Sequence, residues 1–417
     1  MSNKKVIVVG AGIVGLCTAY YLQKKGIEVT VIDNTDGTNN CSYGNAGYIS
    51  PSHMVPLASP GIISQGLKWM LNPESPFYIK PRLNADLIRW GLLFKKASTK
   101  ARVDAAVPVL SQLTLLSKKY YEQILSEENI KAGYSDAGLL MLCKTKSALH
   151  HEIEVAEMAN ALHLDASVLT REETEKLEPG VTLDIEGSVL FKCDAWMTPA
   201  VFMTALKNRL IAKGVKINFN TEFTGAKKAN DKITVLETNK GDFVADEYVL
   251  AAGAWSPILA KSLGISIPLQ AGKGYSFTLK EPVIQPKLPS ILVEARVATT
   301  PMLDGLRFAG TMEIAGTQLD INPLRVSGIV NSISNYLPQF KEQDFSQITP
   351  WAGLRPCTPD GLPYIGRTEK YTNLVIGTGH AMLGFTLGPV TGQLISQEIL
   401  NEKKDFDSKL ISVNRYS

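Results

Sequence analysis

The sequence predicts a two-part fold, in which an α/β domain with a parallel sheet is interrupted by an inserted α+β domain. The chain of 417 residues is longer than a single hydrophobic core usually serves. It opens as a strand, a helix and a second strand, and it closes in a similar βα style. Short strand-like pieces and separate helices lie between the two ends, and they suit a mixed sheet.

The opening segment carries the clearest local pattern. Val6–Val9 is a continuous apolar run, as expected for a strand that is buried on both faces. Ile13–Lys25 has a helical pattern, Gly26 ends it, and Ile27–Ile32 follows as the second strand. The uncharged start superficially resembles a secretory signal peptide, but three glycines interrupt it and no small-residue cleavage site follows. We therefore interpret it as part of the fold.

The remaining elements are expected in an interleaved order. Residues 48–100, rich in Pro, Gly and aromatic side chains, are predicted to be irregular with short helices. Helices are predicted at Ala105–Glu128, Ser147–Leu162, Thr198–Lys213 and Val390–Leu400. Strands are predicted at Gly138–Cys143, Gly187–Lys192, Val215–Asn218, Tyr248–Ala252, Tyr275–Leu279, Ile291–Val297, Leu306–Thr311 and Leu374–Ile376. The interleaving predicts discontinuous domains, one of residues 1–47, 195–272 and 350–417 and one of residues 48–194 and 273–349.

Composition narrows the class of protein without naming a function. Lys and Arg number 43 against 40 Asp and Glu, a net charge of +3, and the two signs are interspersed. Such a balance does not point to nucleic acid or to an acidic partner. The five cysteines are scattered, which argues against a disulfide framework or a metal site and fits a reducing cytoplasm. No uncharged run is long enough to span a bilayer.

The strongest motif lies between the first strand and the first helix. Gly10, Gly12 and Gly15 have the spacing of a dinucleotide-binding loop, in which glycines allow a tight turn and a close approach of the backbone to a pyrophosphate. The N-terminus of the helix then faces the phosphates. Asp33 ends the second strand, near the spacing expected for a ribose-binding acid. Because strand, helix, strand and acid follow in order, we predict a dinucleotide cofactor.

A second segment distinguishes FAD from NAD by resemblance. After Cys41 the chain has Ser42-Tyr-Gly-Asn45-Ala46-Gly47, followed by a Ser-Pro and a Pro-Gly stretch. In this respect the sequence resembles the FAD-dependent D-amino-acid oxidase-like (DAO) superfamily, and within it the D-amino-acid dehydrogenase branch. The resemblance implies a discontinuous Rossmann-like FAD-binding domain with an inserted substrate domain built on a mixed sheet. A small-residue loop of this kind offers free backbone N–H groups to a cofactor.

Three later segments extend the resemblance: Ala251-Ala-Gly-Ala-Trp255, the neighbourhood of Phe223, and the glycine-rich loop that begins at Gly377. The helix after this loop would aim its positive end at the flavin. The residues expected to bind the cofactor are Gly10, Ala11, Gly12, Ile13, Val14, Gly15, Asp33, Asn34, Ser42, Asn45, Ala46, Gly47, Phe223, Ala252, Gly253, Trp255, Gly379, His380, Met382, Leu383, Gly384, Phe385 and Thr386.

Arg355 is the candidate for substrate binding. It stands in Trp351-Ala-Gly-Leu-Arg355-Pro, and in relatives such as glycine oxidase the arginine of this motif binds the substrate carboxylate. A planar guanidinium holds a carboxylate through two parallel hydrogen bonds. A substrate-contacting Tyr of the oxidases is absent near Pro301, and Met382 replaces their second Arg. Tyr275 and His53 are therefore candidate catalytic-site residues, with Met312 or Glu313 as further pocket candidates, although packing explains each equally well.

The expected reaction is oxidative deamination of a D-amino acid to a 2-oxo acid, by hydride transfer from Cα to flavin N5. Electrons would pass to a quinone or another acceptor. Alternatives are a D-proline or hydroxyproline dehydrogenase, an oxidase that uses O₂, and a non-catalytic flavin-binding subunit of a complex. No metal is expected.

The protein is expected in the cytoplasm, and apolar residues with nearby lysines suggest peripheral contact with the inner face of a membrane as an open alternative. Packing in the core explains them equally well. These residues are Ile62, Ile63, Leu67, Lys68, Trp69, Met70, Leu71, Trp90, Gly91, Leu92, Leu93, Phe94, Lys95 and Lys96.

Overall fold

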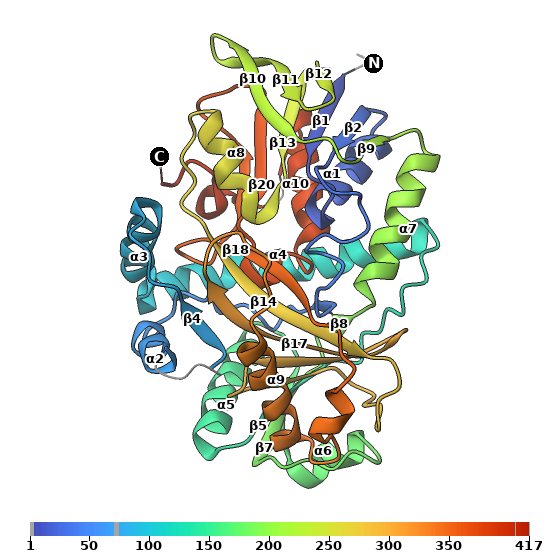
Figure 1. The fold of residues 1–417 in the computed structure, drawn as a ribbon, viewed down its shortest axis with the longest axis vertical. Helices are drawn as coiled ribbons and strands as arrows, with labels where there is room; N and C mark the ends of the chain where they lie inside the picture. Colours follow the sequence, from blue (N-terminus) through green and yellow to red (C-terminus); the bar gives the residue numbers. More distant parts are fainter. Residues whose placement is uncertain (1–3, 71–74, 405, 417) are drawn as a thin grey trace.

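The computed structural model describes residues 4–70, 75–404 and 406–416. Figure 1 shows two lobes, one built on a parallel sheet at the top of the view and one built on a larger mixed sheet below it. The predicted combination of α/β and α+β architecture is confirmed.

The first sheet has six strands in the order β19-β20-β13-β1-β2-β9. All neighbours are parallel except β19, which runs antiparallel to β20. The strands are β1 Lys5–Val9, β2 Glu28–Ile32, β9 Lys216–Asn218, β13 Glu247–Leu250, β19 Tyr364–Arg367 and β20 Leu374–Thr378. The helices of this lobe are α1 Ile13–Lys24, α7 Pro199–Ala212, α8 Ser256–Ser262 and α10 Gly388–Leu400. The predicted opening βαβ unit is confirmed as β1, α1 and β2.

Beyond this sheet a three-stranded ribbon projects at the end of the lobe (Figure 1). It consists of β10 Phe223–Ala229, β11 Lys232–Thr238 and β12 Gly241–Phe243. Single-turn 3₁₀ helices are η1 Gly253–Trp255, η2 Glu342–Phe345, η3 Ala381–Leu383 and η4 Lys409–Ile411.

The second sheet has the strand order β18-β14-β17-β16-β15-β5-β7-β6, and β4 adds to β17 beside this path. Its strands are β4 Phe77–Ile79, β5 Leu139–Cys143, β6 Ala166–Thr170, β7 Gly187–Phe191, β14 Gln270–Leu279, β15 Ser290–Leu292, β16 Val297–Met302, β17 Gly305–Ile314 and β18 Trp351–Cys357. Most pairs are antiparallel, whereas β15·β5 and β17·β4 are parallel. One face packs on α9 Pro323–Tyr336 through a separate apolar core.

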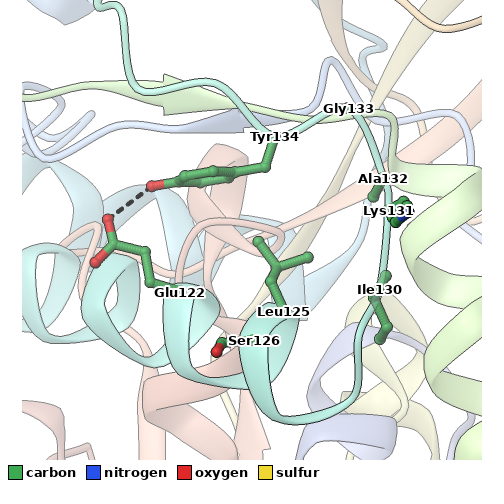
Figure 2. A pocket seen from close by; sticks show the side chains of 8 residues that line it. All are labelled: Glu122, Leu125, Ser126, Ile130, Lys131, Ala132, Gly133 and Tyr134. Carbon is green, nitrogen blue, oxygen red and sulfur yellow. Dashed lines mark hydrogen bonds between the residues drawn. The ribbon is translucent and has the colours of Figure 1, made fainter.

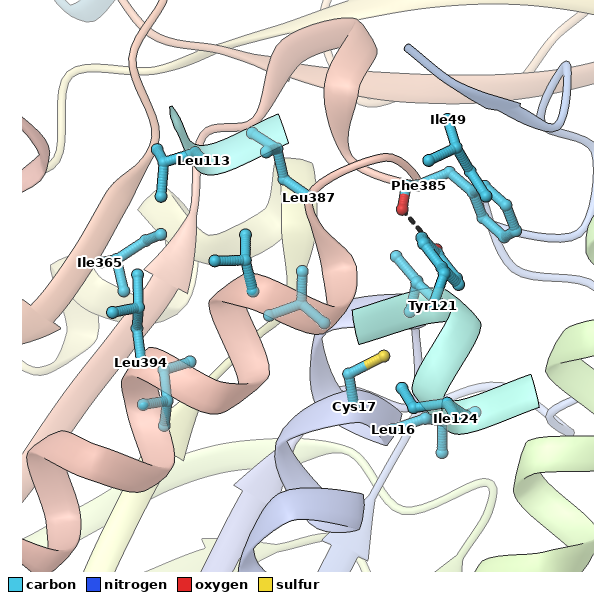
Figure 3. Close-up of a cluster of buried hydrophobic side chains, with 14 of the residues drawn as sticks. Leu16, Cys17, Ile49, Leu113, Tyr121, Ile124, Ile365, Phe385, Leu387 and Leu394 are labelled. Carbon is cyan, nitrogen blue, oxygen red and sulfur yellow. Dashed lines mark hydrogen bonds between the residues drawn. The ribbon is translucent and has the colours of Figure 1, made fainter. Parts of the chain in front are cut away.

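The helix α4, Lys100–Glu127, joins the lobes, and it lies across the middle of the molecule in Figure 1. Its apolar face belongs to one buried cluster with α1, α7 and α10. Figure 3 shows this cluster, in which the Tyr121 hydroxyl of α4 donates to the Phe385 carbonyl just before α10. The other helices are α2 Ile62–Trp69, α3 Ala85–Ala97, α5 Lys146–Ala161 and α6 Arg171–Leu177. A two-stranded pair, β3 Tyr48–Ile49 and β8 Ala195–Trp196, lies between the lobes.

The single strand predicted at Ile291–Val297 is wrong, because this segment is the turn of a hairpin between β15 and β16. Glu294 stabilises the turn by accepting hydrogen bonds from the backbone N–H groups of Lys144 and Thr145 and from the Tyr336 hydroxyl. Arg296 takes a left-handed conformation there, with φ of +55°. These partners are distant in sequence, so the apolar run alone did not reveal the turn.

The second sheet crosses two of the expected domain boundaries. The boundary between residues 272 and 273 falls inside β14, and residues 351–357 form β18, which pairs with β14 along its length. The division into two discontinuous domains stays a prediction, and the pairing favours keeping β14 and β18 together with the mixed sheet. Across the described ranges, no helix is both long and apolar enough to cross a membrane.

Candidate functional site

The glycine loop has the tight geometry that its motif predicts. Gly10 has φ of +111°, and a Cβ placed on it would lie 2.5 Å from the carbonyl oxygen of Ala251. A Cβ on Gly15 would lie 1.8 Å from the carbonyl oxygen of Gly10. Both positions therefore exclude a side chain. Gly12 stands at the N-cap of α1, where it has no side chain that could accept from the first N–H groups of the helix.

Asp33 is held rigidly at the end of β2. Its Oδ2 accepts from the backbone N–H of Ala11 at 2.6 Å, and its Oδ1 accepts from the backbone N–H and hydroxyl of Thr35 at 2.8 and 2.5 Å. The backbone N–H of Thr221 donates to the carbonyl of Asp33 at 2.8 Å, which brings the start of β10, including Phe223, beside this acid. Asn34 is exposed.

The second cofactor segment joins the glycine loop to the mixed sheet. The Ser42 hydroxyl accepts from the backbone N–H of Ile13 at 3.0 Å. The four following carbonyls, of residues 43–46, accept hydrogen bonds from side chains of the mixed sheet. Gly47 has φ of +81°, and a Cβ on it would lie 2.2 Å from the carbonyl oxygen of Met197. We call residues 42–47 the cofactor loop.

The side chains that hold the cofactor loop were not singled out from the sequence. They are Arg307 of β17, Ser276 of β14 and Thr300 of β16. A signal was present, since Ser276 and Thr278 alternate with Tyr275 and Phe277 along β14, which is typical of a strand with one polar face. Its meaning required the identity of the segment that lies on that face.

The C-terminal glycine-rich loop lies next to the glycine loop through the contact of α10 with α1. A Cβ on Gly388 would lie 2.4 Å from Cγ1 of Ile13, and Gly392 approaches the backbone of Cys17 equally closely. The Thr386 hydroxyl donates to the carbonyl of Tyr48 at 2.9 Å, which connects this loop to the end of the cofactor loop. Gly384, Leu383 and Phe385 lie in the same loop, whereas the Met382 side chain is 47% exposed.

His380 is buried and hydrogen-bonded rather than poised for proton transfer. Its Nε2 lies 2.9 Å from the Thr391 hydroxyl, and burial lowers the pKa of the ring to about 3. The neutral form is therefore the stable one at ordinary pH. Gly379 precedes it with φ of +81°, and a Cβ there would lie 2.5 Å from the Thr358 side chain.

The segment after β13 approaches the same region. Gly253 has φ of +53°, and its carbonyl accepts from the Thr378 hydroxyl at 2.8 Å, at the end of β20. Ala252 caps η1, and Trp255 ends it. The ends of β1, β13 and β20, which are parallel neighbours, thus bring the three sequence-separated glycine segments to one edge of the first sheet.

Arg355 lies on the face of the mixed sheet that carries the cofactor loop. In register it pairs with Gly272, so its side chain shares a face with Gly274 and Ser276. The guanidinium lies over Gly274, where a Cβ would be 1.9 Å from Nη1. Nη1 donates to the Thr311 carbonyl at 2.7 Å, and burial lowers the pKa of the guanidinium. On the same face, the Trp351 ring covers Gly44 of the cofactor loop.

Tyr275 lies on the opposite face of the sheet from Arg355. Its ring belongs to the apolar core under α9, and its hydroxyl accepts from the backbone N–H of Asn322 at 3.3 Å and lies 3.5 Å from Oε2 of Glu313. Glu313 in turn forms an ion pair at 3.4 Å with Lys273, which also faces that side. The structure therefore brings neither Tyr275 nor Glu313 together with Arg355.

His53 belongs to a separate group of polar side chains with Ser52 and Asp194. Its Nδ1 is 3.0 Å from the Ser52 hydroxyl, which donates to the buried carboxylate of Asp194 at 2.6 Å. Burial lowers the pKa of His53 and raises the pKa of Asp194. Met312 stands beside Gly272, and it packs in an apolar cluster with Trp90, Ile314 and Cys357.

A surface pocket on the far side of α4 contains none of these residues. Figure 2 shows it between the end of α4 and the following loop, where the Tyr134 hydroxyl donates to Glu122 at 2.8 Å. It is lined by Glu122, Leu125, Ser126, Ile130, Lys131, Ala132, Gly133 and Tyr134.

Comparison with known proteins identifies the family. Residues 5–398 match the family model described as FAD dependent oxidoreductase (DAO). The protein belongs to this family. A curated D-amino acid dehydrogenase of Granulibacter bethesdensis is 31% identical over 99% of this chain and 100% of its own length. One from Helicobacter pylori is 32% identical over 96% of this chain and 97% of its own length.

Solved structures of this family share the fold. Glycine oxidase from Geobacillus kaustophilus superposes with a TM-score of 0.80 at 20% identity, covering 99% of this chain and 100% of that one. L-proline dehydrogenase from P. horikoshii superposes with a TM-score of 0.72 at 19% identity, covering 99% of this chain and 98% of that one.

The geometry of the glycine segments fits the FAD cofactor of the family. The backbone at Gly10 and Gly15 comes so close to its neighbours that no Cβ fits. The Ile13 N–H donates to Ser42, and the rest of the first turn of α1 leaves backbone N–H groups for a pyrophosphate. Asp33 supplies a fixed acid beside that end. The individual assignments of cofactor-binding residues stay predictions.

Proposed function

We propose that the protein is a FAD-dependent D-amino-acid dehydrogenase in which Arg355 binds the substrate carboxylate. The observation that carries this proposal is the position of Arg355 on the same sheet face as the cofactor loop, with its guanidinium over Gly274. The names of relatives that are 31–32% identical over nearly the whole chain support the same chemistry.

Arg355 suits carboxylate binding because of how it is held. Nη1 donates to the Thr311 carbonyl, and this hydrogen bond holds one side of the guanidinium in place. The rest of the planar fork can then serve a carboxylate through parallel hydrogen bonds. Since the group is largely removed from water and has no carboxylate beside it within the described chain, an anionic ligand would be attracted strongly.

The reaction removes two electrons and two protons from the carbon–nitrogen unit of the substrate. The amine becomes an imine, and water then converts the imine to a 2-oxo acid and ammonia. FAD, when bound, supplies the two-electron acceptor. The chain contributes the binding and orientation of the substrate through Arg355, and catalysis by positioning is consistent with this simple arrangement. Tyr275 and His53 stay untested predictions, and the contacts above favour structural roles for both.

We further propose that the electrons pass to a quinone or a similar acceptor at a membrane surface. Exposed apolar side chains on and before α3 support this: Leu83 is fully exposed, Ile88 is 55% exposed and Leu92 is 66% exposed. Lys95 and Lys96 lie in the last turn of α3 and would attract anionic lipid.

Part of the surface expected from the sequence turns inward instead. Trp90 is buried, donates from Nε1 to the Cys357 carbonyl at 2.9 Å and stacks on Phe94. Ile63 of α2 is exposed, whereas Leu71 and the Leu67 side chain lie outside the part of the chain that the structure describes.

Anaerobic titration of the purified holoenzyme with D- and L-amino acids, including both prolines, tests the substrate proposal. We expect bleaching of the flavin absorbance by D-amino acids and not by their L-enantiomers. An oxidised spectrum that no D-amino acid changes would contradict the proposal and favour a non-catalytic flavin subunit.

Two further measurements test the electron acceptor. Turnover with a quinone analogue is expected to exceed peroxide release in air, and the reverse result would indicate an oxidase. Binding to vesicles with anionic lipid is expected to weaken in Leu92→Ser, with exposed Val244→Ser of the distant ribbon as the matched control. Equal binding by both variants would contradict the membrane proposal.

A further inference from the structure

Arg307 is a buried cation whose partners are backbone carbonyls. The residue lies near the start of β17 and is only 8% exposed. Its Nη1 donates to the carbonyl oxygens of Asn45 at 2.8 Å and Tyr43 at 3.1 Å, and its Nε donates to the Thr278 hydroxyl at 3.1 Å. Two carbonyls of the cofactor loop therefore meet on one guanidinium nitrogen.

Hydroxyl side chains on the strands next to β17 also donate hydrogen bonds to the cofactor loop. Thr278 of β14 and Thr300 of β16 are the register partners of Arg307 on either side, so the three side chains stand on one face of the sheet. The Thr300 hydroxyl donates to the carbonyl of Ala46 at 2.8 Å, and the Ser276 hydroxyl donates to the carbonyl of Gly44 at 2.9 Å. Four consecutive carbonyls of the cofactor loop are thus bound by the sheet.

The charge of Arg307 has no acid beside it within the described residues. Desolvation lowers its pKa, and the carboxylate that opposes this effect, Asp304, is exposed and not in hydrogen-bond contact. Two other partly buried arginines have close acids, Arg367 with Glu247 at 2.7 Å and Arg415 with Asp360 at 2.8 Å. Arg355, on the same sheet face as Arg307, has none within the described residues. A guanidinium does not lose its proton in a protein, so Arg307 remains an uncompensated positive charge.

The missing negative charge is expected on the other side of the cofactor loop. That loop is tied to the first turn of α1 through Ser42 and Ile13, where the glycine segments form the cofactor site. The cofactor of the family carries a pyrophosphate, and its flavin becomes more negative on reduction. Because Arg307 is largely removed from water, water screens its charge poorly, and the charge can act across the cofactor loop.

We propose that Arg307 is a positioning residue for the cofactor, which fixes the cofactor loop by its carbonyls and places a positive charge behind it that stabilises the bound anion and the reduced flavin. The residue is not a catalytic group, because it contacts the loop and not the substrate. The inference uses the FAD family alone and does not depend on which amino acid is oxidised.

Four variants separate the charge from the hydrogen bonds. Arg307→Met removes both, Arg307→Gln keeps one neutral donor, and Arg307→Lys keeps the charge but loses the planar fork. Thr300→Val removes one hydroxyl that donates to the cofactor loop and leaves the charge in place. For each variant we would measure the dissociation constant of FAD from the apoprotein, the midpoint potential of the bound flavin and the melting temperature.

For Arg307→Met and Arg307→Gln we expect FAD binding to weaken at least tenfold. We also expect reduced flavin to lose about tenfold in relative affinity, which corresponds to a midpoint potential about 30 mV more negative for a two-electron couple. Arg307→Lys is expected to weaken FAD binding severalfold while the flavin keeps the wild-type midpoint potential. Thr300→Val is expected to keep the potential and to lose affinity only slightly.

A purely structural role predicts a different outcome. In that case Arg307→Met and Arg307→Gln would lower the melting temperature while the midpoint potential of the flavin stayed at the wild-type value. This result would overturn the proposal. If neither neutral variant folds, Arg307→Lys decides, because unchanged FAD affinity after loss of the fork would equally overturn it.

Discussion

Arg355 Nη1 donates to the carbonyl oxygen of Thr311 at 2.7 Å, and Thr311 itself has φ of +67°. A β-branched residue rarely adopts this left-handed conformation, which costs about 1–3 kcal/mol. The pairing of β14 with β17 shifts register at this point, since Lys273 pairs with Glu313 and Tyr275 with Gly310. The bulge therefore turns the Thr311 carbonyl toward Arg355 and sets the direction of the guanidinium.

Replacing Arg355 by lysine tests the carboxylate assignment. An ammonium cannot reproduce the planar fork or the bond to Thr311 together with a bidentate carboxylate contact. We expect Arg355→Lys to keep bound flavin and to raise KM about tenfold or more. Arg367→Lys, in β19 and paired with Glu247, is the matched control and should leave KM unchanged. An unaltered KM in Arg355→Lys would contradict the assignment.

Replacing Thr311 by glycine tests the strain at the bulge. Glycine adopts a positive φ freely, and this gain of about 1 kcal/mol offsets the lost side-chain packing. We expect the free energy of unfolding to change by less than about 1 kcal/mol. The same change at Thr299, a buried residue of the extended strand β16, should cost about 2 kcal/mol or more because packing and its hydroxyl contact to Ser290 are lost. Denaturant unfolding of both variants would reveal equal losses if the strain were absent.

Two helical glycines offer a direct test of the close approach of backbone segments at the glycine loop, residues 10–15. Gly15 lies in α1 against the carbonyl of Gly10, whereas a Cβ on Gly91 of α3 would meet nothing within 4 Å. We expect Gly15→Ala to lose bound FAD and to destabilise the protein. Gly91→Ala should retain FAD and raise the free energy of unfolding by about 0.5–1 kcal/mol, because alanine favours the helix. Flavin content after purification and thermal melting measure both effects.

His380 predicts a specific pH dependence of stability. Its pKa in the folded protein, about 3, lies below the ordinary value near 6.5, so the unfolded chain binds a proton that the folded chain does not. The stability from neutral His380 is fully present above pH 6.5 and falls as the pH is lowered toward 3, by up to about 1.4 kcal/mol per pH unit. In His380→Gln, which can still contact Thr391, the decline below pH 6.5 should be shallower. Parallel curves for the two proteins would show that the ring is not the titrating group.

Much of the site could be predicted from the sequence where its residues are close together in the chain. The glycine loop, the following helix and Asp33 span a single βαβ unit, so their spacing reveals both the turn and the acid. The cofactor loop and the segment around Arg355 were identified from short runs of residues by resemblance. In contrast, Ile291–Val297 was mistaken for one strand, because the residues that stabilise its turn, among them Lys144 and Tyr336, are far away in sequence.

Tyr275 illustrates a further limit of the sequence. The segment in which it stands made it a candidate for the substrate pocket, but alternation along β14 puts its side chain on the opposite face of the sheet from Arg355. The choice of face depends on register with β18, which is more than seventy residues away, and no local pattern determines it.

The sequence by itself determined the nucleotide-binding loop, the family resemblance and the arginine proposed to bind substrate, because each depends on residues whose spacing is local. Only the tertiary structure decided what surrounds them: Arg307 under the cofactor loop, Thr311 beside Arg355 and the burial of Tyr275 under α9. These relationships arise from strand pairing and a register shift between segments far apart in the chain, and pairing of that kind is set by the packing of the whole sheet.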